Sequence, residues 1–250
     1  MKVVPLFTSA FSFKSILSLE KPDKAAKSGA DSIISMCRYN KIKQVFLVED
    51  NMAAFLQAVK GCGDKLQLIY GLRVTIKKDL KAKKDETDSS AKYVIFANNS
   101  KGYKKLIEIA TFASTEGFST KGPTLDFESL ASMWSEDLTL VIPFYDSFIH
   151  KNTFYFSKCV PDFSFCEPVL FVEDNGLYFE ERLREKALAY AKGHNYEVVN
   201  TQSIYYKTRK DFIAWQTYRC IQNRTSLEKP NLDYCSSDEF CLEAWKEKNK

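Results

Sequence analysis

Short apolar runs and helically spaced apolar positions alternate along most of the chain. Runs rich in β-branched and aromatic side chains predict buried strands at residues 3–7, 44–48, 66–76, 93–97, 138–144, 169–172 and 197–201. Apolar residues at helical spacing predict helices at residues 21–37, 52–60, 101–114, 180–192 and 208–221. This alternation favours βα units around a mostly parallel sheet or barrel.

Three segments of this pattern carry further detail. The helix at 21–37 is interrupted by Ser28 and Gly29, which predicts a break or a cap. The run at 66–76 contains Gly71 and is compatible with one strand or with a strand pair. Residues 77–92 (KKDLKAKKDETDSSAK) are strongly polar and predict a solvated loop. Its six lysines leave nucleic-acid binding open, although acidic residues are interleaved with them.

The chain shows no internal repeat and no low-complexity linker. Its 250 residues, 45% of them hydrophobic, are enough for one large α/β core, so we expect a single domain over residues 1–250. The segment SSDEFCLEAWKEKNK near the end predicts a capped helix over residues 237–248.

Charge and hydropathy exclude some function classes. Lys and Arg number 36 against 32 Asp and Glu, and the net charge of +4 is far from that of a dedicated duplex-DNA reader. No stretch approaches the roughly 20 apolar residues that span a bilayer, and the amino terminus does not resemble a signal peptide. We therefore expect a cytoplasmic protein without a membrane partner.

The sequence has seven cysteines, an odd number, and none of their spacings is the two-residue gap of a zinc knuckle. Reduced thiols fit this count best. Local pairing within 159–166 or within 235–241 remains the alternative. The only two histidines are His150 and His194, both in polar surroundings, where solvated surface positions are expected.

No familiar catalytic motif is present. The sequence has no Gly-rich phosphate loop, no Gly-x-Ser-x-Gly elbow and no cysteine with a plausible histidine partner. On the helix at 208–221, Phe212, Trp215 and Tyr218 are spaced for packing into a core, and a partner-facing aromatic surface is the alternative.

Three segments carry a resemblance to a known family. Residues 98–118 (NNSKGYKKLIEIATFASTEGF) have a GY dipeptide before a helix that ends at a glycine and an aromatic residue. Residues 180–222 combine a helix rich in Glu, Leu and Ala, a strand, a YY dipeptide, an acidic helix and a CI turn, and residues 68–74 read LIYGLRV. Taken in chain order, these three segments resemble the PHP domain that opens the bacterial DNA polymerase III alpha subunit and other C-family polymerases.

The resemblance implies a distorted (β/α)7 barrel of the PHP type, an α/β fold with its site at the carboxyl ends of the strands. In the family, His, Asp and Glu side chains there bind a cluster of divalent metals that activate water. The family's metal-ligand positions fall on neutral side chains, on two carboxylates and on one cation. They are Leu6 and Thr8 (or Phe7 and Ser9), Glu49, Asp50, Arg73, Ser203 and Tyr205.

These replacements imply a vestigial site without metal, cofactor or catalytic residue. We expect Arg73 to form an ion pair with Glu49 or Asp50 that fills the old site. The alternative is a magnesium site rebuilt from Glu49, Asp50 and Asp174, which the positive charge of Arg73 would oppose.

Three functions follow from the resemblance. The first is a noncatalytic structural and docking domain of a replicative DNA polymerase, either an amino-terminal fragment or a separate subunit, in a bacterium or a bacteriophage-infected cell. Its partners would be the polymerase body, other replisome proteins or a proofreading exonuclease, with DNA contact open. The second is a PHP-type metal-dependent phosphoesterase or exonuclease with a rebuilt site. The third is a standalone protein that mimics a host polymerase domain.

Overall fold

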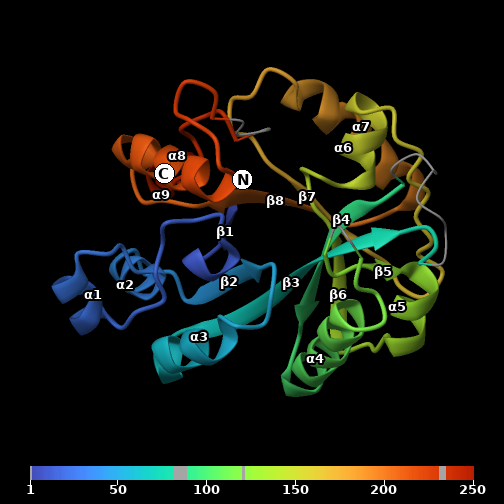
Figure 1. Cartoon of the computed structure of the whole chain (residues 1–250), viewed down its shortest axis with the longest axis horizontal. Coiled ribbons are helices and arrows are strands. Elements are labelled where there is room, and N and C mark those ends of the chain that lie inside the picture. Colours follow the sequence, from blue (N-terminus) through green and yellow to red (C-terminus); the bar gives the residue numbers. More distant parts are fainter. Residues whose placement is uncertain (1, 81–88, 120–121, 231–234) are drawn as a thin grey trace. The chain divides into compact units, whose positions relative to one another are not determined.

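The computed structural model describes residues 2–80, 89–119, 122–230 and 235–250. Strands and helices alternate along most of the chain (Figure 1). The strands are β1 (Val4–Phe7), β2 (Gln44–Glu49), β3 (Gln67–Lys77), β4 (Ala91–Ala97), β5 (Leu125–Asp126), β6 (Leu138–Ile142), β7 (Val169–Val172) and β8 (Val198–Ile204). The α-helices are α1 (Pro22–Ser28), α2 (Ile33–Tyr39), α3 (Phe55–Cys62), α4 (Ser100–Ser114), α5 (Phe127–Met133), α6 (Phe148–Phe154), α7 (Glu180–His194), α8 (Phe212–Asn223) and α9 (Leu242–Lys248). Short 3-10 helices are η1 (Ala10–Ser12), η2 (Gly63–Lys65) and η3 (Arg209–Asp211).

The strand order confirms the predicted fold class. Within the described residues the strands pair in the order β2-β1-β8-β7-β6-β4-β3-β5, and β2 also pairs with β3. Seven strands therefore follow one another in the closed order of a PHP-type (β/α)7 barrel, while β5 is a short addition beside β3. Strand β4 runs antiparallel to both β3 and β6. The sequence pattern favours a mostly parallel sheet and does not predict this reversed strand.

Most predicted elements are present within a few residues of the predicted positions. The interruption at Ser28 and Gly29 separates α1 from α2, and Gly29 has a φ of 72°, a left-handed conformation that favours glycine. The run at 66–76 forms the single strand β3. Within the described residues, none of the seven cysteines forms a disulfide.

The polar pattern misled the prediction at three places. Helices α5 and α6 and strand β5 were not predicted, because their short apolar stretches lie among serines and aspartates. The predicted loop at 77–92 is too long at both ends, since β3 includes Lys77 and β4 begins at Ala91; residues 81–88 lie outside the described part. The last helix begins at Leu242 rather than at residue 237, with Cys241 as its N-cap.

Contacts between residues divide the chain into two compact units. Unit 1 contains residues 1–70, 173–178 and 200–250, and unit 2 contains residues 71–172 and 179–199. Each unit is described by itself below. The expectation of one domain over residues 1–250 stays a prediction.

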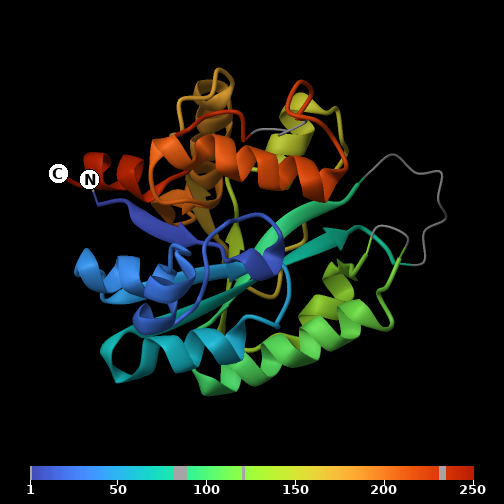
Figure 2. The ribbon, with the colours of Figure 1, turned by 60° about the vertical axis from the view of Figure 1, so that its left-hand side comes forward.

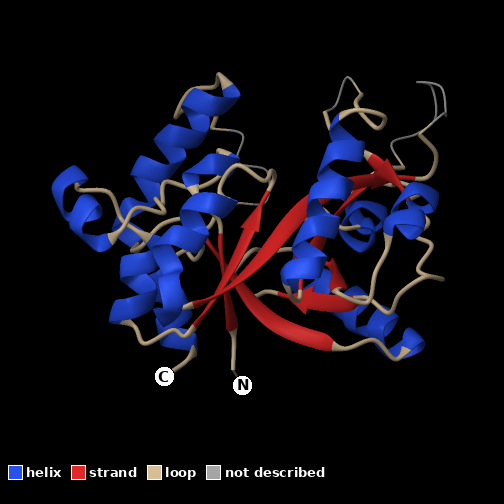
Figure 3. Ribbon diagram, turned by 90° about the horizontal axis from the view of Figure 1, so that it is seen from below, coloured by secondary structure: helices blue, strands red, loops and turns tan. Residues whose placement is uncertain are grey.

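Unit 1 is built on parallel strands. β1, dark blue in Figure 2, pairs with β2 on one side and with β8 on the other. These strands carry buried side chains. The two ends of the chain lie side by side (Figure 3). Val3 bonds to both Asn249 and Trp245, since its amide donates to Asn249 Oδ1 at 3.0 Å and its carbonyl accepts from Trp245 Nε1 at 2.8 Å.

Unit 2 contains β4, β6 and β7 with helices α4 to α7. An aromatic cluster fills part of its core, with Tyr93, Phe127 and Phe163 in mutual edge contacts. Helix α4 lies close to the backbone at Gly102, where an added Cβ would be 2.2 Å from the carbonyl oxygen of Asp137. The glycine of the GY dipeptide therefore serves close packing. In the described residues, no helix combines the length and the apolar character needed to span a membrane.

Candidate functional site at the carboxyl ends of the parallel strands

Three parallel strands of unit 1 end together. Leu6 and Phe7 of β1 are in register with Ser203 and Ile204 of β8, and Phe7 is also in register with Leu47 of β2. Because carboxyl ends of parallel strands meet at one edge, the residues that follow these strands share one side of the unit. The predicted positions Leu6, Thr8, Glu49, Asp50, Ser203 and Tyr205 therefore lie in this region of unit 1.

Thr8 links β1 to β2. Its hydroxyl donates to the carbonyl of Val48 at 3.0 Å, and its amide donates to the carbonyl of Ile204 at 3.4 Å. The side chain is 2% exposed, so this hydroxyl is already used by the fold.

Glu49 is fully buried at the end of β2. The amide of Ser9 donates to its Oε1 at 2.8 Å, and the hydroxyl of Ser12 donates to its Oε2 through a short hydrogen bond. Burial disfavours the charged form and raises the pKa of Glu49 to about 7, although the bonds from Ser12 and Ser9 act in the opposite direction. This carboxyl group thus titrates near neutral pH.

Asp50 points to a different partner. Its carboxylate lies 3.2 Å from Nζ of Lys14, and its backbone amide donates to Oγ of Ser12 at 2.8 Å. Ser12 therefore joins Glu49 to Asp50, since its hydroxyl donates to the carboxyl group of Glu49 and accepts from the amide of Asp50.

A second buried carboxylate, Glu173, directly follows β7 and is 5% exposed. Ser203 donates to it twice, from its amide at 2.9 Å and from its hydroxyl at 2.7 Å. The side-chain amide of Asn175 adds a third bond at 3.0 Å. The chain itself therefore supplies three donors to this carboxylate.

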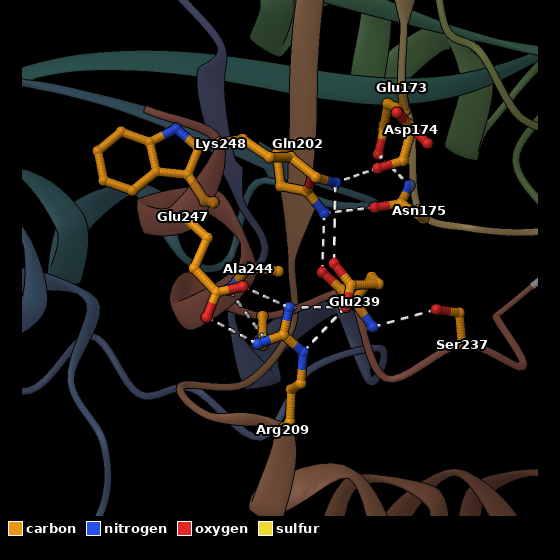
Figure 4. A network of polar contacts seen from close by, with 12 residues as sticks. Glu173, Asp174, Asn175, Gln202, Arg209, Ser237, Glu239, Ala244, Glu247 and Lys248 are labelled. Carbon is orange, nitrogen blue, oxygen red and sulfur yellow. Dashed lines mark hydrogen bonds and ion pairs between the residues drawn. The ribbon is translucent and has the colours of Figure 1, made fainter. Parts of the chain in front are cut away.

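A polar network joins this carboxylate to the last helix (Figure 4). Gln202 donates from Nε2 to Oδ1 of Asn175 and, at 2.8 Å, to the carbonyl of Glu239. Its Oε1 accepts from Lys248 of α9 at 2.7 Å, and Lys248 also donates to the carbonyl of Asp174.

Arg209 extends the network. Its guanidinium binds Glu247 through two hydrogen bonds, at 2.8 and 3.1 Å, and Glu239 through a third, at 2.9 Å. These bonds hold the pKa of Glu247 below its ordinary value. They position α9 against the loop that precedes it (Figure 4).

Tyr205 belongs to an aromatic stack. Its ring lies parallel to the ring of Trp215, with centroids 5.9 Å apart. It also stacks on the ring of Phe240, with centroids 5.7 Å apart. Trp215 is 1% exposed and donates from Nε1 to the carbonyl of Lys14 at 2.7 Å. The core interpretation of the aromatic helix is confirmed for Trp215, whereas Phe212 and Tyr218 are half-buried.

Arg73 belongs to the segment of β3 that lies in unit 2, where it is half-buried. It is in register with Val94 of β4. The expected ion pair with Glu49 or Asp50 therefore stays a prediction.

His150 corrects one expectation. Instead of lying in a polar loop, His150 is in α6 and is 2% exposed. Ser147 caps this helix, and the residues directly after Ser147 are apolar and buried. Nδ1 of His150 accepts from the amide of Asp146 at 3.1 Å, and the His150 ring stacks on Phe179. Burial lowers the pKa of His150. His194 is exposed at the end of α7, as expected.

Glu173 and Ser12 were not identified from the sequence, and Ser9 was named only as an alternative position of the vestigial site. A signal existed for Glu173, because it directly follows a predicted strand, yet its neighbour Asp174 was chosen as the nearby acid. Asp174 is exposed and Glu173 is buried. Within the part of the chain that the structure describes, no three His, Cys, Asp or Glu side chains are grouped to hold a metal ion.

Comparison with known proteins agrees with the fold. The PHP domain family matches residues 8–193, which begin directly after β1 and extend into the last turn of α7. No curated protein matches the chain in sequence. Since the family match covers more than half of the 250 residues, the chain belongs to the PHP domain family.

Proposed function

We propose that this chain is a noncatalytic PHP-type domain of a replicative DNA polymerase, either an amino-terminal fragment or a separately encoded subunit, with a structural and docking role in DNA replication. Such a domain would act in the cytoplasm of a bacterium or an infected cell. The membership in the PHP family supports the general class, and the resemblance of residues 98–118 and 180–222 supports the polymerase context.

One observation carries the noncatalytic part of the proposal. The buried carboxylates Glu49 and Glu173 accept hydrogen bonds from donors of the chain, with serines supplying most of them. A metal cluster of the family's kind needs imidazole and carboxylate ligands whose lone pairs face an ion. Leu6, Thr8, Ser203 and Tyr205 offer no imidazole, so the residues present do not fit that cluster.

The charge balance supports the same proposal. An ammonium group, that of Lys14, lies beside Asp50, where a cation would otherwise compensate the carboxylate. The fold therefore balances the charge of Asp50 without an added ion.

Metal-dependent thermal unfolding tests the noncatalytic part. The purified chain is heated with zinc, manganese or magnesium, and hydrolysis of a generic phosphodiester is measured in parallel. A metal at a hundredfold excess over its Kd would stabilise the fold by about 2.7 kcal/mol, which raises the Tm by roughly 5–10 °C in a chain of this size. We expect no shift and no hydrolysis. A shift that Glu49→Gln abolishes, together with hydrolysis, would establish the phosphoesterase with a rebuilt site instead.

The docking part needs a separate test. A C-family polymerase that lacks its own PHP domain is mixed with this chain and separated by size-exclusion chromatography. We expect the two to elute together, with a proofreading exonuclease as a second candidate in the same assay. Separate elution from both proteins would argue against the replication role while leaving the result on metal binding intact.

A further inference from the structure

Unit 1 carries a groove between two helical walls. Helices α1 and α2 form one wall, and α9 with residues Lys207 and Thr208 forms the other. The groove has a volume of about 950 Å³, is partly open to solvent and exposes a mainly apolar lining. This volume is at the upper end of the range for ligand sites, so it accommodates several apolar side chains at once.

Two side-chain pairs cross the groove. Lys207 binds Asp31 at 2.9 Å, and Nζ of Lys246 lies 5.9 Å from the ring centroid of Tyr39. Tyr39 is 84% exposed although it lines an apolar groove. Exposure of an aromatic ring beside an apolar floor is typical of a docking surface.

The acids of the groove are already bound within the fold. Asp31 is paired with Lys207, and Glu247 is paired with Arg209, which lies outside the lining. Glu243 accepts a hydrogen bond from the amide of Arg209 at 2.9 Å.

Lys246 and Lys250 are the exceptions among the charged side chains of the groove, since no described carboxylate forms an ion pair with either of them. The described contact of the Lys246 ammonium group is the Tyr39 ring. An incoming carboxylate would therefore meet an ammonium group that needs no other bond to be broken first. Charge complementarity at this rim favours a negatively charged occupant.

We propose that this groove binds an acidic amphipathic segment of a partner protein. Its apolar side chains would cover the floor at Met36 and Leu242, and one of its carboxylates would pair with Lys246 beside the ring of Tyr39. An amphipathic helix that lays its apolar face into a groove is a common recognition mode. The proposal depends only on the groove and stands apart from the polymerase role.

The same chemistry disfavours nucleic acid. A phosphate backbone carries a charge at every nucleotide, and it would lie beside Asp31, Glu243 and Glu247. A peptide needs only one or two carboxylates and supplies the apolar surface that the lining matches.

The test uses a fluorescein-labelled peptide of about 15 residues with leucines at i, i+3, i+4 and i+7 spacing, two glutamates on its polar face, and alanine or glutamine at the other positions. Binding to the whole chain is followed by fluorescence anisotropy. The comparison probes are the same peptide with every glutamate replaced by lysine and a single-stranded poly-dT oligonucleotide.

Two groove variants and one control complete the design. Lys246→Glu reverses the rim charge, and Ser35→Trp places a bulky, neutral side chain in the groove. Lys104→Glu makes the same charge change on an exposed position of α4 that does not line the groove. Thermal unfolding of each variant shows whether it has folded, and the second groove variant serves if the first does not fold.

We expect binding of the acidic peptide that weakens about fivefold or more in each groove variant, remains unchanged in Lys104→Glu and declines with added salt. Equal binding by the groove variants, equal binding of the lysine peptide, or no binding of the acidic peptide would overturn the proposal. Tighter binding of the oligonucleotide, lost in Lys246→Glu, would overturn it in favour of a nucleic-acid site.

Discussion

The free energy of unfolding of this protein should depend on pH partly through the titration of Glu49, and replacing Glu49 by glutamine should remove most of that contribution. The carboxyl group is fully buried, and burial raises its pKa from 4.5 to about 7. Between these two values the folded chain binds more protons than the unfolded chain, so the free energy of unfolding decreases as the pH rises. Above pH 7, where its carboxyl group is charged, Glu49 therefore destabilises the folded chain. Well below pH 4.5, where the group is protonated in both states, this effect is absent.

The magnitude follows from the two pKa values. Their difference, at about 1.4 kcal/mol for each pKa unit, corresponds to about 3 kcal/mol in the free energy of unfolding. Glutamine has no titrating group, but it cannot accept hydrogen bonds from both Ser9 and Ser12 through oxygen. One lost bond costs about 1 kcal/mol, and at pH 5 the titration of Glu49 already costs the native chain about 0.8 kcal/mol. Glu49→Gln should therefore be about as stable as the native chain at pH 5 and about 2 kcal/mol more stable at pH 8.

Urea denaturation at several pH values between 5 and 8 measures this effect. The quantity of interest is the difference in the free energy of unfolding between Glu49→Gln and the native chain at each pH. The control is Glu185→Gln, in which the replaced carboxylate is exposed on α7. A difference that stays constant with pH, or that changes in the opposite direction, would refute the assignment of a raised pKa to Glu49.

Three further predictions concern packing and burial. Gly102→Ala should destabilise the fold by about 1–3 kcal/mol, because the added Cβ would lie 2.2 Å from a backbone carbonyl oxygen. Gly193→Ala on α7 has open space around the added Cβ and should stabilise the fold by about 0.5 kcal/mol. Thermal unfolding of both variants checks this difference. Ser203→Ala removes a hydroxyl donor from the buried carboxylate of Glu173 and should cost about 1–3 kcal/mol in urea denaturation, and an unchanged midpoint would contradict that role. His150→Phe should weaken the loss of stability below pH 6.5, since a buried imidazole with a lowered pKa binds fewer protons when folded than when unfolded; urea midpoints at pH 5 and pH 7 check this.

The sequence determined the order and type of most elements because their signals are local. A run such as residues 169–172 is apolar at every position, and the helix at 180–192 shows its period within the segment itself. The glycine at residue 29 marked a helix end for the same local reason. Family membership also followed from motifs read along the chain, before any contact was known.

Only the tertiary structure decided what the site residues do. Glu49 is held by serines 37 and 40 residues earlier in the chain, and Glu173 by a serine 30 residues later. Such donors leave no mark in the local pattern, so the raised pKa of Glu49 and the hydrogen-bond partners of Glu173 were not accessible from sequence. The burial of His150 likewise depends on rings from other elements. Periodicity fixes which face of an element is apolar, whereas the partner that meets a polar side chain is fixed by contacts between distant segments.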